Sequence, residues 1–202
     1  MSSWNKKYEK QSACYPDNML IRFIAKHYYN SSDRKKIRIL DVGCGTGASS
    51  WFLAREGFSV AAIDGSLVAI EKIKDRLTKE RLEAFLACGD ITQLEFKSDF
   101  FDAIIDINSL CYIQKDKIEG VMQSLFKVLK PGGRIFSMSP ADNCSKLIFN
   151  EIEEATFQNY LEIKQSFNNF SDVKINTLSY DLERGEDWQH IHLWIVEAVK
   201  NE

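Results

Sequence analysis

Three glycines at alternate positions, Gly43, Gly45 and Gly47, directly follow the apolar run 39–42. An apolar run that ends in closely spaced glycines is typical of a strand that turns through a tight loop into a helix. Because glycine has no Cβ atom, a ligand can approach such a loop closely, and the N–H groups of the loop and of the helix N-terminus face it. We therefore expect a nucleotide or nucleoside ligand here.

Two ligand classes fit this loop. Gly43-x-Gly45-x-x-Ala48 matches the fingerprint of dinucleotide-binding proteins, which would indicate an NAD-dependent oxidoreductase. Asp41, two residues before the first glycine, would repel a pyrophosphate and attract a cation. S-adenosylmethionine (SAM) carries a sulfonium and an ammonium group beside its nucleoside, so Asp41 favours SAM. The alternative is that Asp41 caps the loop by accepting backbone N–H bonds.

Two further acids follow the next two predicted strands. Asp64 ends the run 58–63 and lies about 20 residues after Gly43, the position of a ribose-binding carboxylate. Asp90 follows the run 84–88 and could accept a hydrogen bond from an adenine amino group, while Ile91 covers the ring. Each acid alone could be a turn former, but the two together favour a nucleoside site.

On these motifs the chain resembles the class I SAM-dependent methyltransferases, over about residues 37–138 and a C-terminal hairpin. The segments 101–110 and 125–134 are similar to the fourth strand of that family and to the helix end that precedes its fifth strand. The resemblance implies SAM as cofactor and S-adenosylhomocysteine (SAH) as product. The cofactor-binding residues expected from it are Asp41, Gly43, Cys44, Gly45, Asp64, Gly65, Ser66, Asp90, Ile91 and Asp106.

The segment Asp106-Ile-Asn-Ser109 departs from the Asn/Asp-Pro-Pro-Tyr motif of methyltransferases that act on the amino groups of nucleic-acid bases and glutamine. Base N-methylation is therefore disfavoured. The net charge of −3 and the short, mixed lysine clusters argue in the same direction, because a phosphate backbone needs a basic stripe. We expect a small-molecule acceptor and no nucleic-acid partner.

Alternating strand-like and helix-like segments predict an α/β fold, a doubly wound and mostly parallel sheet. The resemblance implies seven strands with an antiparallel C-terminal hairpin. Asp17 and Ser66 are expected to cap helices, and Asp116 with Glu119 resembles a capping box. The segment Lys146–Phe167 is predicted as one amphipathic, aromatic-rich helix.

The length of 202 residues and the hydrophobic content of 45% suit one domain with a full core. We expect a single methyltransferase domain over residues 1–202, as a monomer or homodimer. Its parts are a cap or lid (1–36), a cofactor-binding core (37–138), a substrate-side segment (139–172) and a C-terminal hairpin (173–202).

Acceptor recognition is expected from residues outside the cofactor motifs. Trp4, Tyr8 and Tyr15 could close over the methionine end of SAM and the acceptor, or could anchor the first helix to the core. Asn108 and Tyr112 follow the fourth predicted strand and could orient the acceptor. Methyl transfer is an in-line displacement, so alignment and exclusion of water are the main tasks of these residues.

A hydroxyl acceptor needs a general base, whereas an amine needs only its neutral form. His190 begins the last predicted strand, which would place it at the carboxyl edge of the sheet, where ligands bind in open α/β folds. His190 is therefore the candidate catalytic residue. A structural role for His190, with Asp142 as the base, is the alternative.

The five cysteines have no C-x-x-C spacing, so we expect reduced thiols and no metal. The N-terminus has no apolar signal region and the chain has no long apolar run, which predicts a cytoplasmic protein without a membrane partner.

The sequence therefore predicts a methyltransferase that moves the methyl group of SAM to oxygen or nitrogen of a small molecule. The opening with Trp4, Tyr8 and Tyr15-Pro16 is similar to that of bacterial enzymes that modify sugars or surface-glycan precursors, and this resemblance implies a sugar or glycan precursor as candidate acceptor. The alternatives are an NAD-dependent oxidoreductase and a catalytically silent, SAM-binding partner protein.

Overall fold

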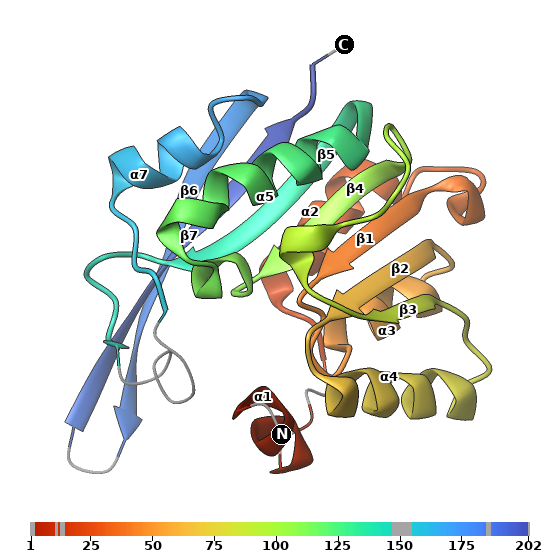
Figure 1. Cartoon of the computed structure of the whole chain (residues 1–202), viewed down its shortest axis with the longest axis horizontal. Helices are drawn as coiled ribbons and strands as arrows, with labels where there is room; N and C mark the ends of the chain where they lie inside the picture. The colour runs from red at the N-terminus through yellow and green to blue at the C-terminus, as the bar shows by residue number, and fades with distance from the viewer. Residues whose placement is uncertain (1–2, 11, 13–14, 147–154, 185–186, 202) are drawn as a thin grey trace.

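The computed structural model describes residues 3–10, 12, 15–146, 155–184 and 187–201. A seven-stranded sheet runs through the protein in the order β3-β2-β1-β4-β5-β7-β6 (Figure 1). The first five strands are parallel, and β7 pairs antiparallel with both β5 and β6. The predicted fold class is confirmed. The strands are β1 (Arg38–Val42), β2 (Ser59–Asp64), β3 (Phe85–Cys88), β4 (Phe101–Ile107), β5 (Leu129–Pro140), β6 (Ser171–Arg184) and β7 (Asp187–Val199).

Helices cover both faces of the sheet (Figure 1). The core on one face joins the sheet to α2 (Asn18–Tyr28), α3 (Ala48–Arg55) and α4 (Leu67–Lys79). The core on the other face joins it to α5 (Lys115–Val128) and α7 (Tyr160–Ser166). Further helical segments are α1 (Ser3–Lys10) and the short 3₁₀ turns η1 (Arg34–Lys36), η2 (Ile91–Gln93) and η3 (Leu110–Tyr112).

Two of the three predicted helix starts are confirmed. The Asp17 carboxylate accepts a hydrogen bond from Met19 N at 2.7 Å, and the Ser66 hydroxyl accepts one from Ala69 N at 3.2 Å. The capping box at Asp116 is wrong, because α5 begins earlier, after Gln114, without a side-chain cap. Asp116 lies inside the first turn, where its charge interacts favourably with the helix dipole.

The single helix predicted over Lys146–Phe167 is wrong for the described part of that segment. Residues 155–159 are not helical, and residues 147–154 lie outside the described residues. Helix α7 begins after Asn159, whose side chain accepts hydrogen bonds from the backbone N–H of Leu161 and Glu162. The Glu162 carboxylate in turn accepts from Asn159 N at 2.9 Å, which completes a capping box.

The C-terminal hairpin extends past the end of β5. The last pair between β5 and β7 is Pro140 with Leu193, whereas β7 begins at Asp187 and stays paired with β6. The hairpin therefore projects beyond the carboxyl edge of the sheet, as Figure 1 shows at its lower left.

The opposite edge of the sheet is formed by β3. Phe85 on this strand is 60% exposed.

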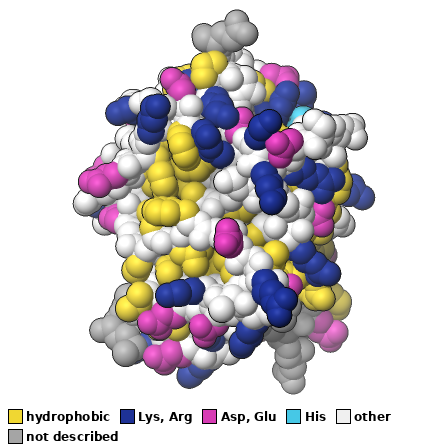
Figure 2. Space-filling view, turned by 90° about the vertical axis from the view of Figure 1, so that its right-hand side faces the viewer, with side chains coloured by type: hydrophobic (Ala, Val, Ile, Leu, Met, Phe, Trp, Pro, Cys, Tyr) yellow, Lys and Arg dark blue, Asp and Glu magenta, His cyan; other side chains and the backbone are white. Residues whose placement is uncertain are grey.

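On the face seen in Figure 2, Lys and Arg side chains are interspersed with hydrophobic and acidic ones and form no continuous basic stripe. Within the described residues, no helix is long and apolar enough to cross a membrane.

Two glycines at the ends of α3 allow a test of the packing between α3 and α4. Gly47 has φ +84°, and a Cβ atom there would lie 2.3 Å from Ile73 Cδ1, a fully buried side chain. Gly57 has φ +88° but no atom near its Cβ position. We expect Gly47→Ala to lower the free energy of unfolding by about 2–5 kcal/mol, since strain and overpacking add, and Gly57→Ala by about 1–2 kcal/mol.

Urea unfolding of both variants measures the difference. Equal losses for Gly47→Ala and Gly57→Ala would contradict the close contact with Ile73.

Candidate active site

The loop after β1 fits closely between three other parts of the chain. Gly43 and Gly45 have φ of +63° and +52°, in the left-handed region. A Cβ atom on Gly43 would lie 2.2 Å from Ser109 Cβ, and one on Gly45 would lie 3.1 Å from Tyr8 Oη. Cys44 N donates to Ile63 O at 3.1 Å. The loop therefore requires glycine both for its conformation and for its neighbours.

Asp64 joins this loop to the end of β2. Its two carboxylate oxygens accept hydrogen bonds from Gly45 N and Ser66 N, each at 2.8 Å. The side chain is buried, and this burial raises the pKa of Asp64. The Ser66 hydroxyl contacts Asn5 Oδ1 at 2.6 Å, which ties α1 to the same corner.

Asp41, near the end of β1, is buried beside the glycine loop. The residue is only 2% exposed, and its carboxylate accepts a hydrogen bond from the Ser50 hydroxyl in α3. Burial raises the pKa of Asp41 from 3.8 to about 7, and the charges of Asp64 and Asp106 act in the same direction. The carboxyl group therefore changes its charge close to neutral pH.

Asp106 at the end of β4 organises the next turn. It is fully buried and accepts hydrogen bonds from the backbone N–H of Ser109 and Leu110, each at 3.0 Å. The hydroxyl groups of Ser109 and Ser137 lie 2.5 Å and 2.6 Å from its oxygens. Burial raises the pKa of Asp106 despite these bonds.

The turn held by Asp106 places Asn108 in an unusual state. Asn108 has φ +55°, and its side-chain Oδ1 is buried without a hydrogen-bond partner. A buried acceptor without a partner costs about 1–3 kcal/mol. Asn108 is therefore a candidate contact for a ligand group that donates a hydrogen bond.

Asp90 follows β3 and is exposed. Its Oδ1 accepts a hydrogen bond from Thr92 N at 2.8 Å and so begins η2. Ile91, beside it, is buried.

Two adjoining cavities surround the glycine loop. Cavity A, of about 690 Å³, lies along the ends of β2, β3 and β4. It is lined by Trp4, Lys7, Tyr8, Gly43, Asp64, Gly65, Cys88, Gly89, Asp90, Ile91, Ile107, Asn108, Ser109, Tyr112 and Ile113. Cavity B, of about 590 Å³, is lined by Tyr8, Lys10, Ser12, Asp41, Gly43, Cys44, Gly45, Thr46, Ala48, Ser49 and Ile107. Tyr8, Gly43 and Ile107 line both cavities.

The predicted aromatic lid is divided between two places. The ring of Trp4 packs on Tyr8 at 5.8 Å and edge-on against Tyr112 at 4.8 Å between centroids, so these three rings gather at cavity A. Burial, with the charge of Asp64, raises the pKa of Tyr8. Tyr15 is 77% exposed and contacts Trp51 instead, outside cavities A and B.

His190 lies on the projecting part of β7. Its Nδ1 is 2.7 Å from Asp181 Oδ1, on the facing residue of β6. His190 is not among the residues that line cavity A or B, and its catalytic role stays a prediction. Asp142, the alternative base, is exposed after the end of β5.

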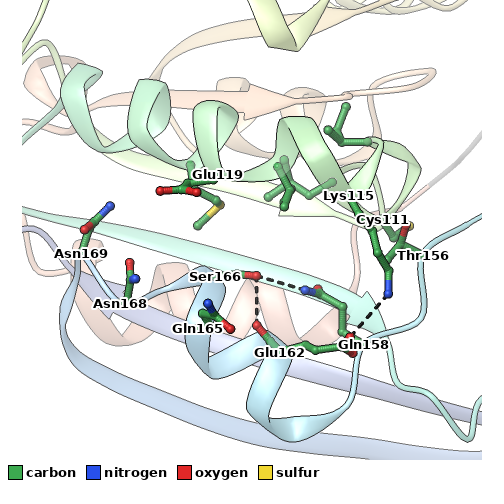
Figure 3. A pocket seen from close by; sticks show the side chains of 14 residues that line it. Cys111, Lys115, Glu119, Thr156, Gln158, Glu162, Gln165, Ser166, Asn168 and Asn169 are labelled. Carbon is green, nitrogen blue, oxygen red and sulfur yellow. Dashed lines mark hydrogen bonds and ion pairs between the residues drawn. The ribbon is translucent and has the colours of Figure 1, made fainter.

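The sequence analysis missed a third cavity, between α5 and α7 (Figure 3). Cavity C has a volume of about 290 Å³ and shares Ile113 with cavity A. Its lining comes from the separate segments 110–122 and 156–169, so no single motif marks it. The sequence feature that could have indicated this cavity is a group of carboxamide side chains close together in the chain, Gln158, Gln165, Asn168 and Asn169. In the described part of the chain no three His, Cys, Asp or Glu side chains form a metal-ligating group.

Residues 39–133 match a family described as a methyltransferase domain. Similar proteins include the sterol 24-C-methyltransferase ERG6 of Saccharomyces cerevisiae, which is 33% identical over 113 residues, 54% of this chain and 29% of that protein. The malonyl-[acyl-carrier protein] O-methyltransferase of Priestia megaterium is 27% identical over 172 residues, 82% of this chain and 55% of that protein. The chain thus aligns with about a third to a half of these relatives.

Solved structures show the same fold at low identity. TehB from Haemophilus influenzae has a TM-score of 0.74 and 17% identity, covering 98% of this chain and 66% of that chain. A SAM-dependent methyltransferase from Methanosarcina mazei has a TM-score of 0.69 and 20% identity, covering 88% and 98%. A Haemonchus contortus phosphoethanolamine N-methyltransferase in complex with SAH has a TM-score of 0.74 and 15% identity, covering 98% and 56%.

The pKa of Asp41 predicts how stability depends on pH. The folded protein holds a proton on Asp41 up to about pH 7, whereas a carboxyl group with the ordinary value of 3.8 loses it earlier. The contribution of Asp41 to the free energy of unfolding is therefore complete below pH 3.8. It declines as the pH rises to about 7, by at most about 1.4 kcal/mol per pH unit. The raised pKa values of Asp64 and Asp106 act with the same sign.

We expect Asp41→Asn to flatten this decline, because an amide does not titrate. Urea unfolding at about pH 5 and about pH 7 tests it, with the exposed Asp142→Asn as control. An equal pH dependence in Asp41→Asn and the parent protein would contradict the assignment.

Proposed function

Because the chain belongs to the class I SAM-dependent methyltransferases, we propose that it transfers the methyl group of SAM to oxygen or nitrogen of a small molecule. The observation that carries the proposal is the pair of adjoining cavities A and B, which share Tyr8, Gly43 and Ile107 at the glycine loop. Their arrangement suits an elongated cofactor with its reactive centre at the junction.

Cavity A fits the adenosine half of SAM. Asp64 and Asp90 stand at the ends of neighbouring strands, and the exposed Asp90 carboxylate accepts a hydrogen bond from Thr92 N through one oxygen, which leaves the other for a ligand. Each Asp64 oxygen accepts one N–H bond and has a second lone pair for a ribose hydroxyl. In our proposal Asp64 binds the ribose, while Asp90 and Ile91 hold the adenine.

Cavity B fits the methionine half. Gly43, Cys44 and Gly45 line this cavity together with Asp41. The ionised carboxylate of Asp64 and, above about pH 7, that of Asp41 favour a cationic ligand over a pyrophosphate. This charge argument is our reason for preferring SAM to NAD.

During methyl transfer, the protein aligns the acceptor with the methyl group of SAM and excludes water. Trp4, Tyr8 and Tyr112 cover cavity A and keep water from the reacting atoms. Asn108 Oδ1 accepts a hydrogen bond from the hydroxyl or amine of the acceptor and so orients its lone pair. SAM supplies an activated methyl group, and an amine acceptor needs no base. For a hydroxyl acceptor we keep His190 as the candidate base, oriented by Asp181.

The acceptor we propose is a small molecule, with a sugar or glycan precursor as candidate. The relatives act, by their names, on sterols and on malonyl-[acyl-carrier protein], so membership of the family does not fix the acceptor. We retain the division into a cap (1–36), a cofactor core (37–138), a substrate-side segment (139–172) and a hairpin (173–202), with the cap and the substrate-side segment next to the acceptor. A monomeric or homodimeric cytoplasmic enzyme without metal stays our prediction.

Cofactor binding gives the first test. We expect SAH to bind and NAD not to bind in a calorimetric titration. Asp64→Asn should weaken SAH roughly ten- to hundredfold, since the neutral amide can no longer accept bonds from both ribose hydroxyls. Asp142→Asn serves as the charge-matched control, and thermal melting confirms folding of each variant. An unchanged SAH affinity in Asp64→Asn would show that the ribose lies elsewhere.

Methyl transfer itself is tested with SAM labelled in its methyl group. We expect label in the small-molecule fraction of a metabolite extract, and less of it with Asp64→Asn. Label found only in bulk RNA or protein would refute a small-molecule acceptor. Binding of SAH without transfer to any fraction would favour the silent-partner alternative.

A further inference from the structure

We infer that cavity C binds an uncharged, hydroxylated ring of the acceptor, such as a single sugar ring. This inference rests on the proposed function, because it assigns the recognition part of the same acceptor. Cavity C adjoins cavity A at Ile113, which lines both. Cys111 lines cavity C and Tyr112 lines cavity A, so the two cavities lie on either side of η3.

The two walls of cavity C differ in chemistry. The α5 side provides an apolar surface from Leu110, Ile118 and Met122. The α7 side provides carboxamides, among them Gln165 and Asn168 (Figure 3). A ligand that fits both walls must have one apolar face and a polar edge.

Carboxamides both donate and accept hydrogen bonds, as hydroxyl groups do. Gln158 is held in place, because its Nε2 donates to Ser166 Oγ at 3.0 Å. The Ser166 hydroxyl in turn donates to Glu162 O at 3.1 Å. A sugar ring has C–H groups on its faces and hydroxyls at its edge, which matches an apolar wall opposite a carboxamide wall.

The charged side chains at cavity C disfavour an anionic ligand. Glu119 and Glu162 line it together with Lys115, whose Nζ lies 3.4 Å from Glu162 Oε1. Glu119 accepts a hydrogen bond from Gln123 at 3.3 Å. Two carboxylates against one ammonium leave the cavity with a negative balance, so phosphorylated or sulfated rings are disfavoured.

The size of the cavity agrees with one ring. Its volume of about 290 Å³ lies just below the range for small-molecule pockets, roughly 300–1,000 Å³, so it suits a small ligand group. The rest of the acceptor then continues past Ile113 into cavity A. Asn108, whose buried Oδ1 has no hydrogen-bond partner, lines that cavity.

Met122 provides a reporter inside cavity C in the unmodified sequence. Protein labelled with ¹³C at the methionine methyl groups is titrated, with SAH present, with glucose, galactose and N-acetylglucosamine. We expect at least one sugar to shift the Met122 methyl signal and to leave that of Met19, in α2, unchanged. Glucose 6-phosphate should bind about tenfold more weakly than glucose. Met122→Leu assigns the signal.

A double variant tests the carboxamide wall. Gln165→Ala with Asn168→Ala changes two exposed side chains and should weaken sugar binding about tenfold, with SAH affinity unchanged. Lys164→Ala, on α7 but outside the lining of cavity C, is the matched control. No Met122 shift with any sugar, or equal sugar binding by the double variant, would overturn the inference. A Met122 shift with the uncharged peptide acetyl-trialanine amide, and with none of the sugars, would also overturn it. Failure of the parent protein to bind SAH would contradict the proposed function instead.

Discussion

The close contact between Gly43 and Ser109 is the constraint on which the rest of the site depends. A Cβ atom on Gly43 would overlap Ser109, so the loops after β1 and β4 can meet only with glycine at this point. The Ser109 hydroxyl lies 2.7 Å from Val42 O and 2.5 Å from Asp106 Oδ1, which fastens the two strand ends together. This fastening gives Asn108 its positive φ and places it beside the glycine loop. The contact between Gly43 and Ser109 thus positions both the glycine loop of the cofactor motif and Asn108 on the acceptor side.

Three buried or nearly buried carboxyl groups lie around the same contact. Asp64, Asp41 and Asp106 stand on the adjacent strands β2, β1 and β4, and each has a raised pKa because burial disfavours its charge. Such a group is costly unless it is hydrogen-bonded or balanced by a cation. The internal bonds from Ser50, Gly45 and Ser137 supply part of this balance. A cationic cofactor would supply more, so that the same charges serve both the architecture and the choice of ligand.

Much of the cofactor half could be predicted from the sequence, because its determinants are local. Glycines after an apolar run and acids at strand ends are visible within a few residues of each other, and the caps at Asp17 and Ser66 act over two or three residues. Burial is a property of the folded chain, so the sequence did not predict that Asp41 is almost fully buried. The start of α5 was predicted two residues too late, because Asp116 and Glu119 have the spacing of a capping box although the helix begins after Gln114. The capping box at Asn159 and Glu162 was visible in the sequence but was absorbed into an assumed longer helix. Cavity C and the separation of Tyr15 from Trp4 depend on tertiary contacts that no spacing encodes.

The most direct test of this account is a crystal structure of the protein with SAH bound. The account predicts the adenine beside Asp90 and Ile91 in cavity A, the amino-acid end over Gly43 and Gly45 in cavity B, and the sulfur at their junction near Asn108. SAH bound in the reverse orientation, or at a site away from the glycine loop, would contradict it.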